Sequence, residues 1–322
     1  MNVLITGAAG FVGRHVAKYL SINTPHRLIP VDLAGERDSP YGEIRQLDLG
    51  NKAALEALFQ SEQLDAVIHL AALVNPNDAI ENPLAYYASN VANTINLLQL
   101  CVHYGVGKFV FASTAAVYGI QECRLIGEDA IKQPVNPYSR SKLMCEQVLE
   151  DTGRACPGFN YAVLRLFFVV GSDGTLELGG QPNANLNVIR IAAQAALGRR
   201  DRIVIYGDNF ATPDGTCVRD YIHIDDISRM FKAALDYLQK GNSSQEFNCG
   251  TGQGYSLKEI TAMMQKVAGV DFDVEIVEPR PNEYPSLMAD ITRARELLDW
   301  EPSQHSLESL CRLSLEFERA LP

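Results

Sequence analysis

Short apolar runs alternate with longer amphipathic stretches through the first half of the chain. The apolar runs are "NVLIT", "RLIPVD", "DAVIHLAA", "KFVFAS" and "YAVLRLF", and the stretches with helical periodicity begin near residue 11 and cover residues 83–104 and 138–152. Strands that are apolar throughout, rather than at every second residue, are typical of a parallel sheet buried on both faces. The alternation with helices therefore predicts an α/β fold with a doubly wound parallel sheet of the Rossmann type.

This alternation ends near residue 168. Loops rich in Gly, Asn, Asp and Pro follow, including "GSDGTLELGGQPNAN" and "GDNFATPDGT", with shorter elements between them. We therefore expect residues 1–167 to form the nucleotide-binding domain. Residues 168–322 should form a smaller α/β substrate domain, with some segments crossing back to the first sheet.

Composition narrows the classes of ligand. The 322 residues include 28 Lys and Arg against 39 Asp and Glu, a net charge of -11, and 47% are hydrophobic. An acidic chain does not attract nucleic acid or an anionic membrane by its overall charge. If the ligand is an anion, particular arginines must bind it locally.

The absence of certain motifs bears on the cellular location and on metal binding. The chain enters a strand pattern at its first residues, without a secretory signal, and has no apolar run of about 18 residues that would span a membrane. Its seven cysteines are scattered without a CxxC pair, which favours reduced thiols and a cytoplasmic location. The six histidines show no metal-binding spacing, so no metal is expected.

Three glycines at the start of the chain indicate a dinucleotide site. Gly7, Gly10 and Gly13 follow the first predicted strand and open the first helix, where glycines let the backbone approach a pyrophosphate. Asp32 ends the next strand, where a carboxylate accepts hydrogen bonds from the adenosine ribose and repels a 2'-phosphate. The pattern therefore favours NAD over NADP.

A tyrosine and a lysine four residues apart indicate acid–base chemistry. Tyr138 and Lys142 share one face of a predicted helix, and an adjacent ammonium should lower the pKa of the phenol from about 10 toward neutrality. Thr114 lies at the carboxyl end of a predicted strand, where open parallel sheets bind ligands. The alternative is that the tyrosine simply packs on the lysine stem.

Motifs along nearly the whole chain resemble those of one enzyme family. They are the glycine triplet, Asp32, "VIHLAA", "ASNV", "STAAVYG", "NPYSRSK", "YGDNFATPDGTCVRDYIHIDD", "FNCGTG" and "ADITRARELLDW". This set resembles the extended short-chain dehydrogenase/reductase superfamily and, within it, the UDP-glucose (UDP-galactose) 4-epimerases. The run "TPDGTCVRDYIHIDD" is the most particular to the epimerases.

The resemblance implies site residues beyond the glycine turn and the Tyr–Lys pair. Tyr138 would be the catalytic acid/base, Lys142 its partner and also a ribose ligand, and Thr114 a hydroxyl near the substrate oxygen. The other implied cofactor residues are Phe11, Val12, Asp48, Leu49, Leu70, Ala71, Ala72 and Asn90. The implied nucleotide-sugar residues are Thr114, Phe168, Asn187, Val188, Arg219, Arg280 and Glu283, the last standing where the family usually has aspartate.

The implied reaction is inversion at C4 of a nucleotide sugar, such as a UDP-hexose, through a 4-keto intermediate with NAD. The related 4,6-dehydratases need an Asp-Glu pair where this chain has Ala115 and Ala116, so dehydration is not expected. A 4-ketoreductase or dehydrogenase of the same superfamily stays open, and so does a non-catalytic NAD-binding regulator. The helices expected at residues 83–104 and 138–152 resemble those that form the epimerases' dimer contact, which implies a homodimer.

Three positions depart from the family pattern, two of them near the sugar and one near the pyrophosphate. Leu166 and Phe168 stand where the epimerases usually have tyrosine and asparagine, and Val74 stands where some members have lysine. Leu287, near the position that limits room at the sugar's C2, is intermediate in size. We expect Phe168 to border the sugar pocket and to shift preference away from plain UDP-glucose and UDP-galactose. The alternative is that Phe168 packs in the core beside Phe167.

Overall fold

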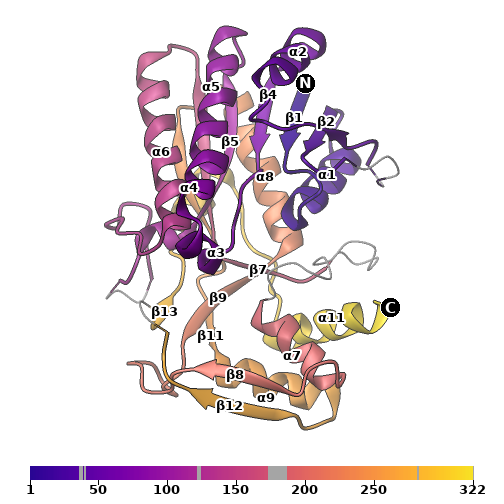
Figure 1. The fold of residues 1–322 in the computed structure, drawn as a ribbon, viewed down its shortest axis with the longest axis vertical. Coiled ribbons are helices and arrows are strands. Elements are labelled where there is room, and N and C mark those ends of the chain that lie inside the picture. Colours follow the sequence, from indigo (N-terminus) through magenta and orange to yellow (C-terminus); the bar gives the residue numbers. More distant parts are fainter. Residues whose placement is uncertain (36–38, 40, 122–124, 173–186, 281–282, 322) are drawn as a thin grey trace.

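A parallel sheet forms the centre of the amino-terminal half. The computed structural model describes residues 1–35, 39, 41–121, 125–172, 187–280 and 283–321. Within them, seven parallel strands pair in the order β10-β6-β5-β4-β1-β2-β3. Figure 1 labels four of these strands, β5, β4, β1 and β2, next to one another. The strands are β1 (Asn2–Thr6), β2 (Arg27–Asp32), β3 (Arg45–Gln46), β4 (Ala66–His69), β5 (Lys108–Thr114), β6 (Asn160–Leu166) and β10 (Gln245–Cys249).

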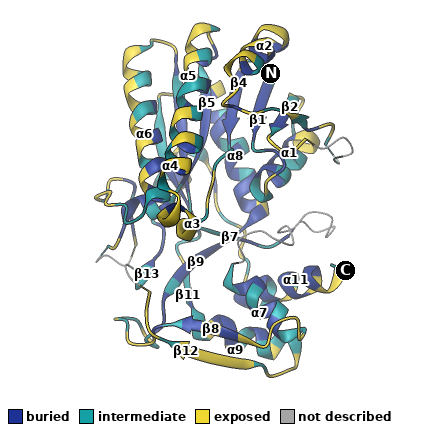
Figure 2. Ribbon diagram, in the orientation of Figure 1, coloured by how far each residue is buried: buried dark blue, intermediate teal, exposed yellow. Residues whose placement is uncertain are grey.

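Helices cover both faces of this sheet, as the sequence predicts. One core cluster joins the sheet to α1 (Phe11–Asn23) and α8 (Ile224–Gln239), and another joins it to α2 (Lys52–Glu62), α5 (Asn93–His103) and α6 (Pro137–Ala155). Figure 2 shows the strands of the sheet largely buried, while the outer sides of α5 and α6 are exposed. The predicted doubly wound α/β class is confirmed.

The helix predicted at residues 83–104 is built from three consecutive pieces. They are α4 (Pro83–Tyr86), a π-helical turn (Tyr87–Ala92) and α5 (Asn93–His103). Before them lies the short helix α3 (Pro76–Glu81), and after β5 comes a 3-10 turn, η2 (Ala115–Tyr118). A π-helical turn inside an α-helix often marks a functional site, and this one carries the buried Asn90.

Smaller sheets and helices make up most of the carboxy-terminal half. Strand β9 (Val218–His223) pairs with β7 (Phe168–Val170), β11 (Gly254–Ser256) and β13 (Ser286–Leu287), and β8 (Arg202–Tyr206) pairs with β12 (Asp273–Val277). A separate core cluster packs β7, β8, β9 and β11 against helices α7 (Val188–Ala196), α9 (Leu257–Ala268) and α11 (Leu307–Ala320). The loop predicted at residues 171–185 lies, except for Gly171 and Ser172, outside the described residues.

Two segments from beyond residue 168 belong to the first half in space. Strand β10 pairs with β6, and α8 packs against α1. The domain boundary at residues 167/168 stays a prediction. In space, the chain passes between the two halves more than once, because β10 and α8 return to the first half.

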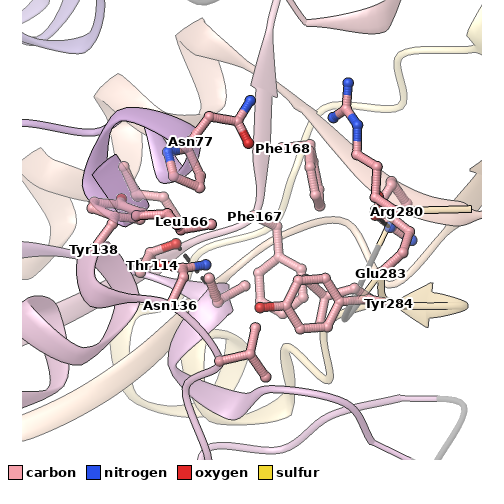
Figure 3. Close-up of a pocket in the computed structure, with 17 residues that line it drawn as sticks. Asn77, Thr114, Asn136, Tyr138, Leu166, Phe167, Phe168, Arg280, Glu283 and Tyr284 are labelled. Atoms are coloured by element: carbon pink, nitrogen blue, oxygen red, sulfur yellow. Dashed lines mark hydrogen bonds and ion pairs between the residues drawn. The ribbon is translucent and has the colours of Figure 1, made fainter. Parts of the chain in front are cut away.

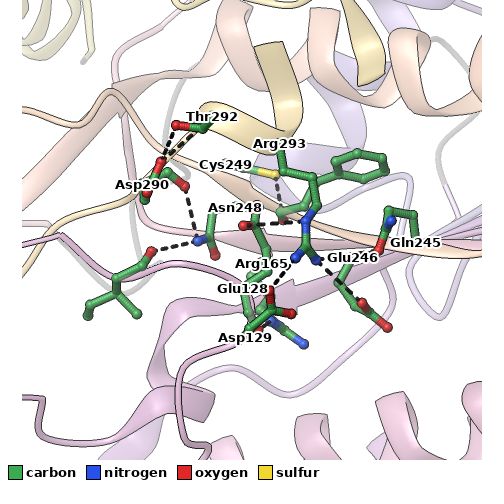
Figure 4. Close-up of polar contacts among 12 residues, drawn as sticks. Glu128, Asp129, Arg165, Gln245, Glu246, Asn248, Cys249, Asp290, Thr292 and Arg293 are labelled. Atoms are coloured by element: carbon green, nitrogen blue, oxygen red, sulfur yellow. Dashed lines mark hydrogen bonds and ion pairs between the residues drawn. The ribbon is translucent and has the colours of Figure 1, made fainter. Parts of the chain in front are cut away.

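Polar contacts fasten the returning strand β10 (Figure 4). The backbone N–H of Asn248 donates to Glu128 Oε1 (2.8 Å), and its side-chain amide donates to the carbonyl of Ile126 (2.7 Å). Arg165 Nη1 donates to the carbonyl of Glu128 (2.8 Å). Arg293, on α10 (Thr292–Leu298), forms an ion pair with Asp129 (2.7 Å). The loop at residues 125–130 is therefore held between β6, β10 and α10.

Candidate active site

The turn between β1 and α1 can take only glycine at two positions. Gly7 has φ +74°, and a Cβ there would lie 2.5 Å from the backbone nitrogen of Ala71. A Cβ on Gly13 would lie 2.0 Å from the carbonyl oxygen of Gly7. Gly10 is the N-cap of α1 and has no side chain to cap it, so Phe11 and Val12 occupy the first turn of a helix whose N–H groups have no side-chain cap. This narrow turn before a helix N-terminus fits a dinucleotide pyrophosphate.

Asp32 lies beside this turn. Its carboxylate accepts hydrogen bonds from the backbone N–H groups of Ala9 (3.0 Å) and Ala34 (3.0 Å). Its carbonyl accepts from the N–H of Leu47 (2.7 Å), which brings Asp48 and the buried Leu49 to the same edge of the sheet. The predicted ribose and adenine residues are thus neighbours of the glycine turn.

Asn90 fixes the loop that follows β4. Its amide oxygen accepts from the N–H of Leu73 (2.8 Å), and its amide nitrogen donates to the carbonyl of Leu73 (3.0 Å) and to Ser141 Oγ (2.9 Å). The predicted cofactor residues Leu70, Ala71 and Ala72 immediately precede this clamp. The amide of Asn90 is therefore occupied by protein contacts, and it would shape a cofactor site through this loop.

Helix α6 carries the predicted Tyr–Lys pair. Asn136 caps the helix by accepting from the N–H of Ser139 (2.9 Å), which sets Tyr138 in its first turn. The Tyr138 side chain lies beside Thr114 at the end of β5, close enough for Thr114 to lower its pKa. Lys142 is buried, with its Nζ 4.4 Å from the centroid of the Phe111 ring. Tyr138 and Thr114 thus adjoin one another at the cavity wall, and Lys142 lies one turn further along α6.

The expected lowering of the tyrosine pKa is wrong for this structure. Burial raises the pKa of Tyr138 to about 12, and the neighbouring Thr114 side chain offsets only part of this rise. Burial also lowers the pKa of Lys142 to about 8. Spacing on a helix predicts that the two side chains are neighbours, but it does not show how strongly burial penalises each charged form.

A cavity of about 690 Å³ opens next to Tyr138 (Figure 3). Its walls are mainly apolar, and they come from both halves of the molecule. The lining residues are Pro76, Asn77, Ile80, Thr114, Ala115, Ala116, Val135, Asn136, Tyr138, Leu166, Phe167, Phe168, Arg219, Arg280, Glu283, Tyr284 and Leu287. The cavity therefore reaches from a group suited to acid–base chemistry to two guanidinium groups.

The two predicted phosphate arginines lie in this cavity, and both stack on aromatic rings. Arg219 forms an ion pair with Glu283 (2.6 Å), and its Cζ lies 5.5 Å from the centroid of the Phe168 ring. The Cζ of Arg280 lies 3.7 Å from the centroid of the Tyr206 ring. An apolar hollow with the buried guanidinium of Arg219 and the exposed guanidinium of Arg280 at its wall suits a ligand with a diphosphate and a ring.

Some predicted residues lie outside the cavity, and some residues that line the cavity were not predicted. Asn187 caps α7, accepting from the N–H of Arg190 (3.0 Å), and neither Asn187 nor Val188 is among the described residues that line the cavity. Sequence reasoning missed Tyr284 and the residues that α3 contributes. Tyr284 adjoins the predicted Glu283, so the nearby aromatic was a usable signal. Nothing in the sequence of α3 showed that it reaches the cavity.

Among the described residues, no three His, Cys, Asp or Glu side chains are grouped so that they would bind a metal ion. In the same part of the chain, no helix is both long enough and apolar enough to cross a membrane.

Comparison with known proteins gives matches along the whole chain. The model of the NAD dependent epimerase/dehydratase family matches residues 3–250. A UDP-glucose 4-epimerase from Azospirillum brasilense is 38% identical, over 99% of this chain and 92% of its own length.

Solved structures match over a similar extent. The UDP-Glc/GlcNAc 4-epimerase of Campylobacter jejuni is 38% identical with a TM-score of 0.85, over 99% of each chain. A UDP-glucose 4-epimerase from Stenotrophomonas maltophila, with bound NAD and formylated UDP-arabinopyranose, is 33% identical with a TM-score of 0.94, over 99% of this chain and 98% of that one.

Proposed function

Because the chain belongs to the NAD dependent epimerase/dehydratase family, we propose that it is an NAD-dependent enzyme that inverts C4 of a nucleotide sugar of the UDP-glucose/UDP-galactose type. One observation carries the proposal: a single cavity is lined by Tyr138 and Thr114 together with Arg219 and Arg280. In a UDP-hexose the reacting 4-hydroxyl and the diphosphate lie on opposite sides of the sugar ring, so one cavity with both kinds of group can contact both.

NAD is the cofactor that fits the amino-terminal turn. Gly7, Gly10 and Gly13 leave room for a pyrophosphate at the start of α1, and Asp32 suits the hydroxyls of an unphosphorylated ribose. Bound there, NAD supplies a reversible acceptor for hydride. Asp48, Leu49 and the Leu70–Ala72 segment would line the rest of its site.

In the proposed reaction Tyr138 moves the proton. Tyr138 Oη takes it from the sugar's 4-hydroxyl while C4 loses hydride, and Thr114 Oγ1 orients the same oxygen. Arg219 and Arg280 hold the diphosphate while the 4-keto sugar turns, so hydride returns to the opposite face and Tyr138 gives the proton back. Alanine at positions 115 and 116 leaves no side chain there that would drive loss of water.

The decisive experiment is a product analysis. The purified protein is incubated with a panel of nucleotide sugars, and the products are resolved while absorbance at 340 nm is recorded. We expect the C4 epimer of at least one UDP-sugar without net accumulation of NADH. Stoichiometric NADH would identify a dehydrogenase, consumption of added NADH would identify a ketoreductase, and no turnover with any sugar would favour a binding protein.

Two further proposals concern the whole protein. A second copy of the chain is the proposed partner of an apolar hollow on the outer side of the helices, lined by Tyr87, Val91, Ala92, Ile95 and Met144. A cytoplasmic location is proposed because the cysteines within the described residues are free thiols.

A further inference from the structure

The guanidinium of Arg219 is enclosed by four protein groups. Its Cζ lies 5.5 Å from the centroid of the Phe168 ring and 5.9 Å from that of Tyr284. Its Nη2 donates to Glu283 Oε1 (2.6 Å), and its Nη1 donates to the carbonyl of Val218 (2.9 Å). Only 6% of the side chain is exposed, yet Arg219 lines the cavity. The guanidinium is therefore held in one orientation at the cavity wall.

The Phe168 ring is itself fixed in place. Strand β7 pairs with β9 so that Phe168 stands opposite Tyr221, and the centroids of the two rings are 5.8 Å apart. Arg219 lies on the same strand, two residues before Tyr221. The Phe168 ring is thus held against β9, the strand that carries Arg219.

Phenylalanine at position 168 limits the contacts that this part of the cavity wall can make with a ligand. Its ring neither donates nor accepts a hydrogen bond, so it cannot bind a sugar hydroxyl as an amide would. A ring packed on a guanidinium does attract the cation, and it restricts the orientations of the free arginine. The arginine therefore loses less conformational entropy when it binds an anion. The contact of Phe168 that matters is therefore with Arg219.

We propose that Phe168 is a positioning residue for the diphosphate, which it serves by holding Arg219 in the orientation that binds phosphate, and that it does not select the sugar. The inference rests on the proposed function, in which Arg219 binds the diphosphate of a UDP-sugar. It predicts that Phe168 affects UDP, which has no sugar, as strongly as it affects UDP-sugars.

The test is calorimetric titration of UDP into the NAD-loaded protein. Phe168→Leu, which removes the ring, should weaken UDP binding about 5- to 30-fold, the range of a largely desolvated cation–π contact. Phe168→Tyr, which keeps the ring, should restore it. In kinetics with the accepted UDP-sugar, KM for Phe168→Leu should rise more than kcat falls. Unchanged NAD content and melting temperature would show that the fold is intact.

A double-mutant cycle with Arg219→Lys tests whether the effect passes through the arginine. Once the guanidinium is absent, adding Phe168→Leu should weaken UDP binding little further. Val170→Ala, at the other end of β7 and not among the described residues that line the cavity, is the control for general loosening and should match wild type for UDP.

Several results would overturn the inference. Wild-type affinity for UDP in Phe168→Leu, additive losses in the cycle, or a changed ranking of UDP-sugars with unchanged UDP affinity would each refute it, and the last result would assign Phe168 to sugar selection. These outcomes leave the proposed function intact. Failure of the wild-type protein to bind UDP at all would instead refute the proposed function, and this inference with it.

Discussion

At Tyr138 the residue's surroundings and its proposed role favour different protonation states. Burial raises the pKa of Tyr138 to about 12, so its hydroxyl keeps its proton at pH 7. A phenol in this state is ready to act as an acid, and it acts as a base only when nearby positive charge stabilises the phenolate. Lys142, one turn further along α6, is the cation on the same helix.

The proton-transfer role predicts the effect of removing one oxygen atom. Tyr138→Phe should lower kcat by at least about 100-fold, the low end of acid–base contributions, while NAD stays bound. The measurement is steady-state turnover of the accepted UDP-sugar, with NAD released and assayed after denaturation. Tyr86→Phe is the control because the Tyr86 ring packs edge-on against Tyr138, with centroids 6.5 Å apart. Similar losses of kcat in both variants would refute the assigned role.

Lys142 should make stability depend on pH. Burial lowers its pKa from 10.5 to about 8, so the unfolded chain binds this proton more tightly than the folded chain. The buried ammonium therefore destabilises the fold at pH 7, and the penalty falls as pH rises from about 8 toward 10.5. Lys142→Met should be more stable than wild type at pH 7, although its turnover should be lost.

Urea denaturation of both proteins measures this penalty. The difference in free energy of unfolding between Lys142→Met and wild type should shrink by about 2 kcal/mol between pH 7 and about pH 9.5. A difference that does not change with pH would mean that burial does not perturb the ammonium.

The sequence pattern predicts where elements end and which residues are neighbours better than it predicts the burial and the long-range contacts of each side chain. The strand ends, the glycine turn and the Tyr–Lys spacing follow from local pattern, and Thr114 does meet Tyr138. The engaged amide of Asn90 and the ring of Tyr284 over Arg219 depend on contacts between segments distant in the chain. The tyrosine pKa was predicted in the wrong direction for the same reason, since burial is a property of the assembled fold.

At the scale of elements, a buried ion pair sets the spacing of the three elements that carry the site. Arg165 on β6 forms two hydrogen bonds with Glu146 on α6 (2.9 and 3.2 Å), and Ser113 on β5 donates to the same carboxylate (2.5 Å). Each member adjoins a cavity or catalytic residue: Ser113 precedes Thr114, Arg165 precedes Leu166, and Glu146 follows Lys142 by one turn. Movement of this pair would therefore displace the proposed catalytic residues.

Breaking the pair from one side should be costly. Arg165→Met leaves a buried carboxylate without its cation and should lower the free energy of unfolding by about 3–5 kcal/mol. The double change Arg165→Met/Glu146→Met should lose less, because no uncompensated charge remains. Urea denaturation measures both.

The same helix offers a matched control. Arg154 pairs with Glu150 on the exposed side of α6, and Arg154→Met should cost about 0.5 kcal/mol or less. Equal losses of unfolding free energy in Arg165→Met and Arg154→Met would show that the buried pair contributes no more to stability than the exposed pair.

For the whole molecule, the proposed partner of the helices is a second copy. Met144 lines the apolar hollow and is 41% exposed, so a charge there would be buried in a dimer. Met144→Glu should convert a dimer into a monomer in sedimentation velocity at micromolar concentration. Val270→Glu, with a similarly exposed (45%) residue outside this hollow, should leave association unchanged. A monomeric wild-type protein would refute the proposal.

The position of β10 affects the order in which the protein can fold during synthesis. Gln245 pairs with Ala162, so the outer edge of β6 cannot pair with β10 until more than eighty further residues have left the ribosome. Until then a nascent chain exposes an apolar strand with unpaired backbone groups, the kind of edge that recruits other chains. The large sheet is thus completed late, and a chain that stalls before residue 245 lacks the strand that covers β6. Expression at lower temperature, or with chaperones that bind nascent chains, would protect this edge during that interval.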